Sequence, residues 1–150
     1  MRTALLAGAF LVATAAPASA ADTDYLIWDS DPNANPTQGR SGNWYAPDPF
    51  SVWEHPDLEL RVKATGPHNE YMQIDLARHD GQRITEGSYV DQRVTIVSGG
   101  FMHADDGAEF TVEHLVRGPD GNISEFEGAV EHHGSDEPDS TFRAKISYRR

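Results

Sequence analysis

Two aspartates near the start of the chain have the side chains and the spacing that a metal ion requires. Asp29 and Asp31 are followed by two asparagines at the same spacing, so that oxygen ligands recur at every second residue, as at the start of an EF-hand calcium loop. The rest of that loop does not match, because Ala34 and Arg40 stand where it needs glycine and glutamate. Asp29 and Asp31 are therefore candidate ligands of another type of calcium site. The alternative is a turn stabilised by its own Asp and Asn side chains.

A second group of candidate metal ligands lies further along the chain. Asp105 and Asp106 complete the predicted calcium ligands, and His103 precedes them. His132 and His133 are adjacent and would face opposite sides of a strand, so they are not expected to bind one ion together. If the two segments met in space, a mixed histidine and carboxylate site would result. The alternative is that both segments are solvated loops at the ends of strands.

Aromatic residues in the first third of the chain suggest a binding surface for sugars. Trp44 and Tyr45 are flanked by Asn43 and Asp48. Exposed rings can stack on sugar faces, while nearby amides and carboxylates bind the hydroxyl groups. These four residues are the predicted ligand-binding site, and the alternative for Trp44 is that it anchors its loop. The other two tryptophans are expected in the core.

Signatures of catalysis are weak in this sequence. It contains no cysteine, which excludes a cysteine nucleophile, and no G-x-S-x-G element. Because carboxylates are abundant, a hydrolase that uses a carboxylate pair stays open as an alternative.

The elements that would position these residues are β-strands, because apolar and polar residues alternate with a period of two. The clearest pattern is a three-strand meander over 109–117, 122–132 and 141–149. Residues 118–122 form its first turn, and we expect a β-bulge near that turn. The proposed register sets Glu127 opposite Lys145. With further strands near 25–28, 50–53, 57–65, 71–78 and 88–97, the sequence predicts an all-β antiparallel sandwich of about eight or nine strands.

The domain organisation follows from composition. Residues 1–20 read as a secretory signal peptide that ends near Ala20, and 21–150 as one domain. Within it, 29–49 is rich in Pro, Gly, Asp and Asn and is expected to be a long loop, and 98–108 a connection. The formal net charge of −12 argues against nucleic acid as a partner, and no membrane anchor is expected. We therefore expect a secreted or periplasmic protein.

Several segments resemble a known family. Residues 80–89 are similar to a D-G-x-x-L-x-x-G-x-Y element, and 107–113, 120–126, 131–134 and 142–148 resemble its later elements. Together they look like a family of small exported bacterial β-sandwich domains whose function is not established. The resemblance covers roughly residues 70–148.

One departure from that family concerns its disulfide. His133 stands where the family has a cysteine, and the upstream cysteine position falls near Met102 or His103. The resemblance implies the fold and export, and it implies no catalytic residue. Taken together, these features predict an exported non-catalytic domain that binds an extracellular glycan or protein surface. The alternative is a structural or protein-interaction module without a small-molecule ligand.

Overall fold

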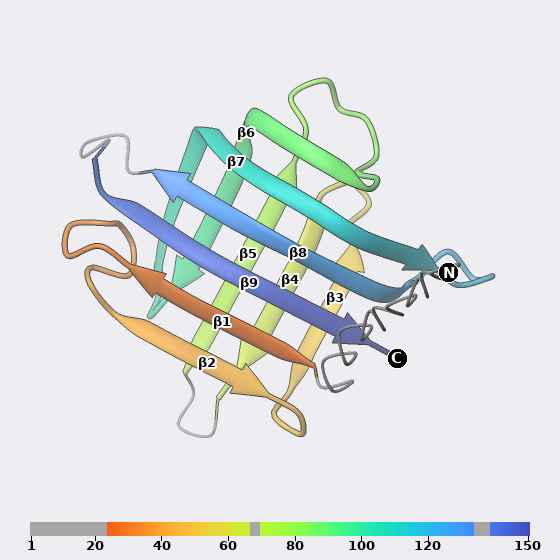
Figure 1. Ribbon diagram of the computed structural model, residues 1–150, viewed down its shortest axis with the longest axis horizontal. Coiled ribbons are helices and arrows are strands. Elements are labelled where there is room, and N and C mark those ends of the chain that lie inside the picture. Colours follow the sequence, from red (N-terminus) through yellow and green to blue (C-terminus); the bar gives the residue numbers. More distant parts are fainter. Residues whose placement is uncertain (1–23, 67–69, 134–138) are drawn as a thin grey trace, which may run out of the picture.

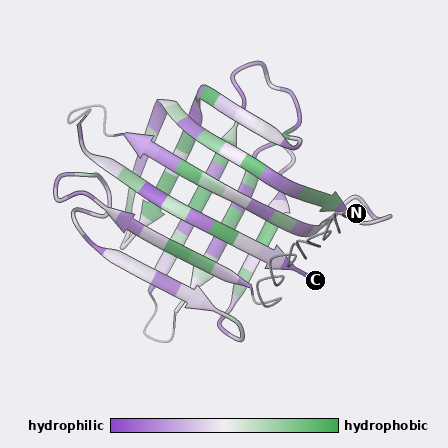
Figure 2. Ribbon diagram, viewed as in Figure 1, coloured by the Kyte–Doolittle hydropathy of each residue, from purple (hydrophilic) through white to green (hydrophobic). Residues whose placement is uncertain are grey.

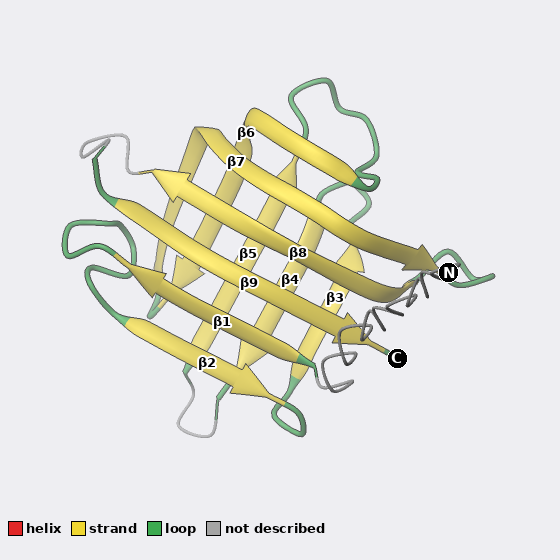
Figure 3. Ribbon diagram, viewed as in Figure 1, coloured by secondary structure: helices red, strands yellow, loops and turns green. Residues whose placement is uncertain are grey.

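The computed structural model describes residues 24–66, 70–133 and 139–150, and every regular element in them is a β-strand (Figures 1 and 3). The nine strands are β1 (Tyr25–Ser30), β2 (Ser41–Tyr45), β3 (Phe50–Glu54), β4 (Leu60–Thr65), β5 (Tyr71–Ala77), β6 (Gly87–Ser98), β7 (Phe101–Arg117), β8 (Ile123–His133) and β9 (Thr141–Arg149). The all-β class is therefore confirmed. No helix capable of crossing a membrane occurs in these residues. The predicted signal peptide, 1–20, lies outside them.

All nine strands belong to one antiparallel sheet with the order β2-β1-β9-β8-β7-β6-β5-β4-β3. The sheet curves into a nearly closed barrel, so that β1, β9 and β8 cross over β5, β4 and β3 in Figure 1. The two separate sheets of a sandwich are not confirmed. The long strands β6 and β7 explain the difference, because they bend and continue from one side of the barrel to the other. Register shifts between Tyr89 and Val94 accompany that bend.

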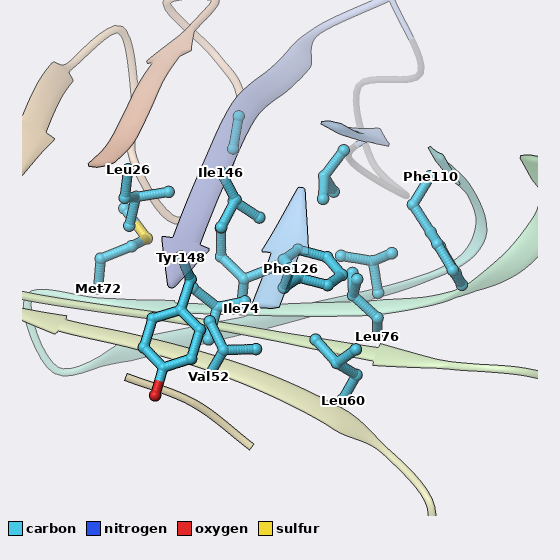
Figure 4. Packing of buried hydrophobic residues seen from close by; sticks show 14 of the residues in the cluster. Leu26, Val52, Leu60, Met72, Ile74, Leu76, Phe110, Phe126, Ile146 and Tyr148 are labelled. Atoms are coloured by element: carbon cyan, nitrogen blue, oxygen red, sulfur yellow. The ribbon is translucent and has the colours of Figure 1, made fainter. Parts of the chain in front are cut away.

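The core lies inside this barrel and follows from the alternation of side chains along each strand (Figure 2). Leu26, Phe126 and Ile146 point inward from one side, and Met72 and Ile74 point toward them from β5 (Figure 4). All five are at most 1% exposed. The barrel is therefore filled by side chains.

The C-terminal meander is confirmed as β7, β8 and β9, and the expected bulge lies between Val112 and His114. The predicted register of β8 and β9 is wrong by two residues, because Glu127 pairs with Ser147. The observed register places Gly128 opposite Ile146, where a Cβ on Gly128 would lie 2.5 Å from the Thr111 carbonyl oxygen and 3.0 Å from the ring of Phe126. Large and small residues thus alternate across the pair, and this packing of the core decides the register.

Two segments expected to lack regular structure contain strands. The loop predicted over 29–49 is interrupted by β2, an edge strand that pairs with β1 from Tyr25–Tyr45 to Asp29–Ser41. The connection predicted over 98–108 is instead a tight turn at Gly99 and Gly100 followed by the start of β7. Both glycines have positive φ, 60° and 84°, which a side chain would disfavour. The turn holds β6 and β7 close together beside the loop that follows β1.

Candidate functional site

A groove lies where the β1–β2 loop, β2, the start of β5 and the β6–β7 turn meet. Its volume is about 530 Å³. We call it the main groove, and its lining combines aromatic rings with hydroxyl, amide, carboxylate and guanidinium groups. It is lined by Trp28, Gly39, Arg40, Ser41, Gly42, Asn43, Trp44, Glu70, Tyr71, Ser98 and Gly99.

The wall of the main groove on β1 and β2 is built on two stacked tryptophans. Trp28 and Trp44 lie with ring centroids 6.3 Å apart and are 6% and 5% exposed. Gly42 pairs with Trp28 across the strands, and a Cβ on Gly42 would lie only 2.7 Å from the Trp28 indole nitrogen. That nitrogen has no hydrogen-bond partner among the described residues. A glycine is thus required for the close approach of the indole ring to the backbone of β2.

The β1–β2 loop is held by hydrogen bonds within itself and to β1. The Ser30 hydroxyl donates to the Arg40 carbonyl at 2.9 Å and accepts from the Gly39 amide at 3.1 Å. Ala34 and Thr37 are buried, at 1% and 0% exposure, and cover this end of the barrel. Gln38 adopts a left-handed backbone with φ of 51°. The loop therefore presents Arg40 to the groove in a defined position.

A second cavity adjoins the main groove, and Arg40 and Gly99 line both. We call it the side cavity, and its volume is about 340 Å³. Its lining contains one guanidinium, two amides, an imidazole and two exposed apolar side chains. The side cavity is lined by Asn35, Pro36, Gln38, Arg40, Gly99, Phe101, Met102 and His103.

Beneath the side cavity lies a pair of histidines. Nδ1 of His103 is 3.4 Å from Nε2 of His132, and the two rings meet edge to face. His132 is fully buried, and its Nδ1 has no hydrogen-bond partner among the described residues. Burial lowers the pKa of His132 to about 4, with Asp105 acting in the opposite direction and His103 adding to the lowering. His132 is therefore neutral at pH 7.

The predicted ligand-binding residues are not brought together as one platform. Trp44 is only 5% exposed, which agrees with the alternative of an anchoring residue, and it lines the main groove together with Asn43. Tyr45, which is 44% exposed, lies on the outer face opposite Tyr25. Asn43 lines the main groove, whereas Asp48 lies in the turn after β2, where its amide donates to the Tyr45 carbonyl at 3.0 Å. The alternation of side chains along β2 points Trp44 into the core and Tyr45 to the outer face.

The aspartates near the β8–β9 connection are engaged by protein donors. Asp31 accepts the Thr141 amide at 2.9 Å and lies 3.4 Å from the Arg143 guanidinium. These two contacts, the Thr141 hydrogen bond above all, lower the pKa of Asp31. Asp29 lies 3.7 Å from the same guanidinium. Arg143 thus supplies the positive charge beside the first predicted pair of calcium ligands.

The second predicted pair of ligands lies within β7 and not in a loop. Asp105 accepts the Gly107 amide at 2.9 Å and the His133 amide at 2.7 Å. Asp106 lies 3.6 Å from the Arg93 guanidinium. The segments around residues 103–106 and 132–133 do meet, but no group of three His, Cys, Asp or Glu residues in the described parts of the chain could hold a metal ion.

Several groove residues were not found from the sequence. Arg40 comes from the β1–β2 loop, and Glu70 and Tyr71 from the start of β5, so no local spacing connects the arginine with the other two residues. Phe101 and His103 follow the pair Gly99-Gly100, which is a recognisable turn signal between two apolar segments. Had that turn been used, a hairpin with an exposed aromatic residue would have been predicted at this end of the barrel.

Comparisons with known protein families, curated proteins and solved structures find no match to this chain. The resemblance of residues 70–148 to exported bacterial domains therefore stays a prediction.

Proposed function

We propose that this chain is an exported, non-catalytic domain that binds a short glycan in the main groove. The observation that carries the proposal is the composition of that groove, whose lining residues include two tryptophans together with hydroxyl, amide, carboxylate and guanidinium side chains. Sugars present both hydroxyl groups and apolar C–H faces, so they match a mixed lining of this kind. The volume of about 530 Å³ is of the size that holds a small ligand.

The alternative position for a glycan is the outer face of β1 and β2. Tyr45 lies there opposite Tyr25, and Ile27, which is 41% exposed, lies opposite Asn43. A sugar on the outer face of a sheet would keep most of its hydration. The main groove is favoured because a concave site desolvates more of the ligand and brings more polar groups to it.

The test is a glycan array, followed by calorimetric titration of the best ligand into matched variants. Glu70→Ala removes an exposed side chain from the groove, and Tyr45→Ala removes one from the outer face. Loss of one hydrogen bond to a charged group is worth about 1.5–3 kcal/mol, so Glu70→Ala is expected to weaken binding at least about tenfold. Tyr45→Ala is expected to leave the affinity unchanged. The reverse result would move the site to the outer face, and an array without any ligand would refute glycan binding.

A further inference from the structure

The side cavity differs in charge from the protein around it. The chain carries a formal net charge of −12, yet no Asp or Glu is present among the described residues that line this cavity. Arg40 supplies the charged group there, and the remaining polar groups are two amides and an imidazole. In the main groove, by contrast, Glu70 provides a negative charge. The side cavity thus contains a positive charge without a negative one among its described lining residues, whereas the main groove contains one charge of each sign.

The Arg40 guanidinium is fixed by carbonyl groups and not by a carboxylate. Its Nε donates to the Thr37 carbonyl at 2.8 Å and its Nη2 to the Pro36 carbonyl at 3.2 Å. Other arginines differ: Arg61, for example, lies 2.6 Å from Asp75. Within the described chain no carboxylate lies within ion-pair distance of Arg40, so none of the described acidic residues forms an ion pair with it. A guanidinium has five N–H donors, and those not used on the loop remain for a ligand.

Apolar surface lies beside this arginine. Phe101 and Met102 line the side cavity and are 71% and 72% exposed. An exposed phenyl ring in the same cavity as a guanidinium that retains unused N–H donors fits a ligand that combines a negative charge with an apolar face. The amides of Asn35 and Gln38 can bind neighbouring hydroxyl groups, although Gln38 already donates to Asn35 at 3.3 Å.

We propose that the side cavity binds the carboxylate of an acidic sugar, which makes uronic-acid glycans the ligand class of this site. Arg40 pairs with the carboxylate, and Phe101 packs on the C–H face of the same sugar ring. The neutral part of the chain continues into the main groove, where Glu70 would repel a second carboxylate. This inference rests on the proposed glycan binding, because it assigns the chemistry of one end of the same ligand.

The test compares two trisaccharides by calorimetry, a β-1,4-linked trimer of glucose and the same trimer with glucuronic acid in place of its terminal non-reducing glucose, called the uronate trimer. They differ by one carboxylate in place of one hydroxymethyl group. The uronate trimer is expected to bind at least about tenfold more tightly, as for a paired charge in a partly desolvated site. Its affinity is expected to fall as sodium chloride rises from about 50 to 500 mM, because salt screens the pair. The affinity of the glucose trimer should not change with salt.

Matched variants locate the effect. Arg40→Gln is expected to abolish the preference for the uronate, and Phe101→Ala to weaken both trimers about threefold to tenfold through loss of ring contact. Lys145→Gln removes the same charge from the outer face of β9, and should leave the preference intact. Because Arg40 also holds its loop, Arg40→Lys and a thermal unfolding curve are included. A folded Arg40→Lys protein that keeps part of the preference supports the pairing.

The outcomes separate this inference from the proposed function. Equal binding of the two trimers, or an unchanged preference in folded Arg40→Gln, overturns the acidic-sugar assignment and leaves glycan binding in place. Failure of both trimers together with an empty glycan array refutes both. A tripeptide with a C-terminal phenylalanine carboxylate is included as a third ligand. If it binds more tightly than the uronate trimer, the carboxylate belongs to a peptide and the assignment to sugars is wrong.

Discussion

The buried histidine at the end of β8 makes the stability of this protein depend on pH in a defined window. His132 is fully buried, and its folded-state pKa of about 4 lies well below the ordinary value of 6.5. The unfolded chain takes up a proton on this residue near pH 6.5, whereas the folded protein resists protonation until about pH 4. The free energy of unfolding contributed by His132 is therefore complete above pH 6.5 and declines as the pH falls toward 4.

The size of this effect follows from the difference between the two pKa values. One pKa unit corresponds to about 1.36 kcal/mol, so a difference of roughly 2.5 units removes about 3 kcal/mol of stability between pH 7 and pH 4. Desolvation is the main cause of the low pKa of His132. The electrostatic interaction with Asp105 raises this pKa, and that with His103 lowers it further. That loss would be a large part of the stability of a domain of this size, which is typically about 5–15 kcal/mol.

The assay is urea unfolding followed by tryptophan fluorescence at several pH values between 4 and 7, in the native protein and in His132→Phe. Phenylalanine keeps an aromatic ring in the core, and it removes both the titrating group and the unpartnered Nδ1. The difference in unfolding free energy between pH 7 and pH 4 is expected to shrink by about 3 kcal/mol in this variant. His55→Gln replaces a partly exposed histidine and serves as the control, in which the native difference should persist. If His132→Phe shows the same pH dependence as the native protein, the reasoning about desolvation is wrong.

Three further predictions concern packing, charge and metal. Gly42→Ala places a methyl group within 2.7 Å of the Trp28 indole nitrogen, and is expected to lower the unfolding free energy in urea by about 1–3 kcal/mol. Asp75→Ala leaves Arg61 without its two hydrogen bonds of 2.6 and 3.0 Å, and should cost about 2–3 kcal/mol in the same assay. Millimolar calcium is expected to leave the thermal midpoint unchanged relative to EDTA, because Asp31 already accepts hydrogen bonds from protein donors.

Each of these has a result that would contradict it. A Gly42→Ala protein as stable as the native one would mean that the indole ring moves aside without cost. For Asp75→Ala, the control is Asp80→Ala, which breaks a solvent-exposed ion pair with Arg78 and should cost clearly less stability than Asp75→Ala. Equal effects of the two variants would contradict the role of burial. A calcium-dependent rise of several degrees would restore the predicted calcium site.

Strands with strict alternation could be predicted from the sequence, and strands that depend on tertiary context could not. β4 and β5 alternate apolar and polar residues because one face of each is buried in the core. β2 carries a glycine and an asparagine, which are turn formers, and it exists because Gly42 fits over Trp28 and Trp44 fits in the core. The backbone of β2 pairs with β1 on one side, and this pairing cannot be predicted from the residues of β2 alone.

The candidate site also depends on tertiary contacts, and for that reason its residues could not be found from the sequence. Asp105 and Gly107 look like loop residues, yet the strand continues through them because the Asp105 carboxylate accepts two backbone amides at the bend of β7. The groove joins residues from the loop after β1, the start of β5 and the β6–β7 turn. The hydrophobic periodicity predicts where the strands lie along the chain, but it does not predict which strand ends and loops come together in space. Arg40 could therefore not be assigned a role before the topology was known.

The position of β9 in the sheet has a consequence for how the chain folds as it is made. β1 pairs with β9 from Tyr25–Ser147 to Ser30–Phe142. The first strand therefore pairs with the strand that is synthesised last. Strands β3 to β8 can pair with their neighbours in order of synthesis, whereas β1 and β2 must wait as an isolated hairpin, which is marginally stable alone. Completion of the barrel, and with it of the groove, is therefore expected to be a late and slow event governed by a contact between distant parts of the sequence.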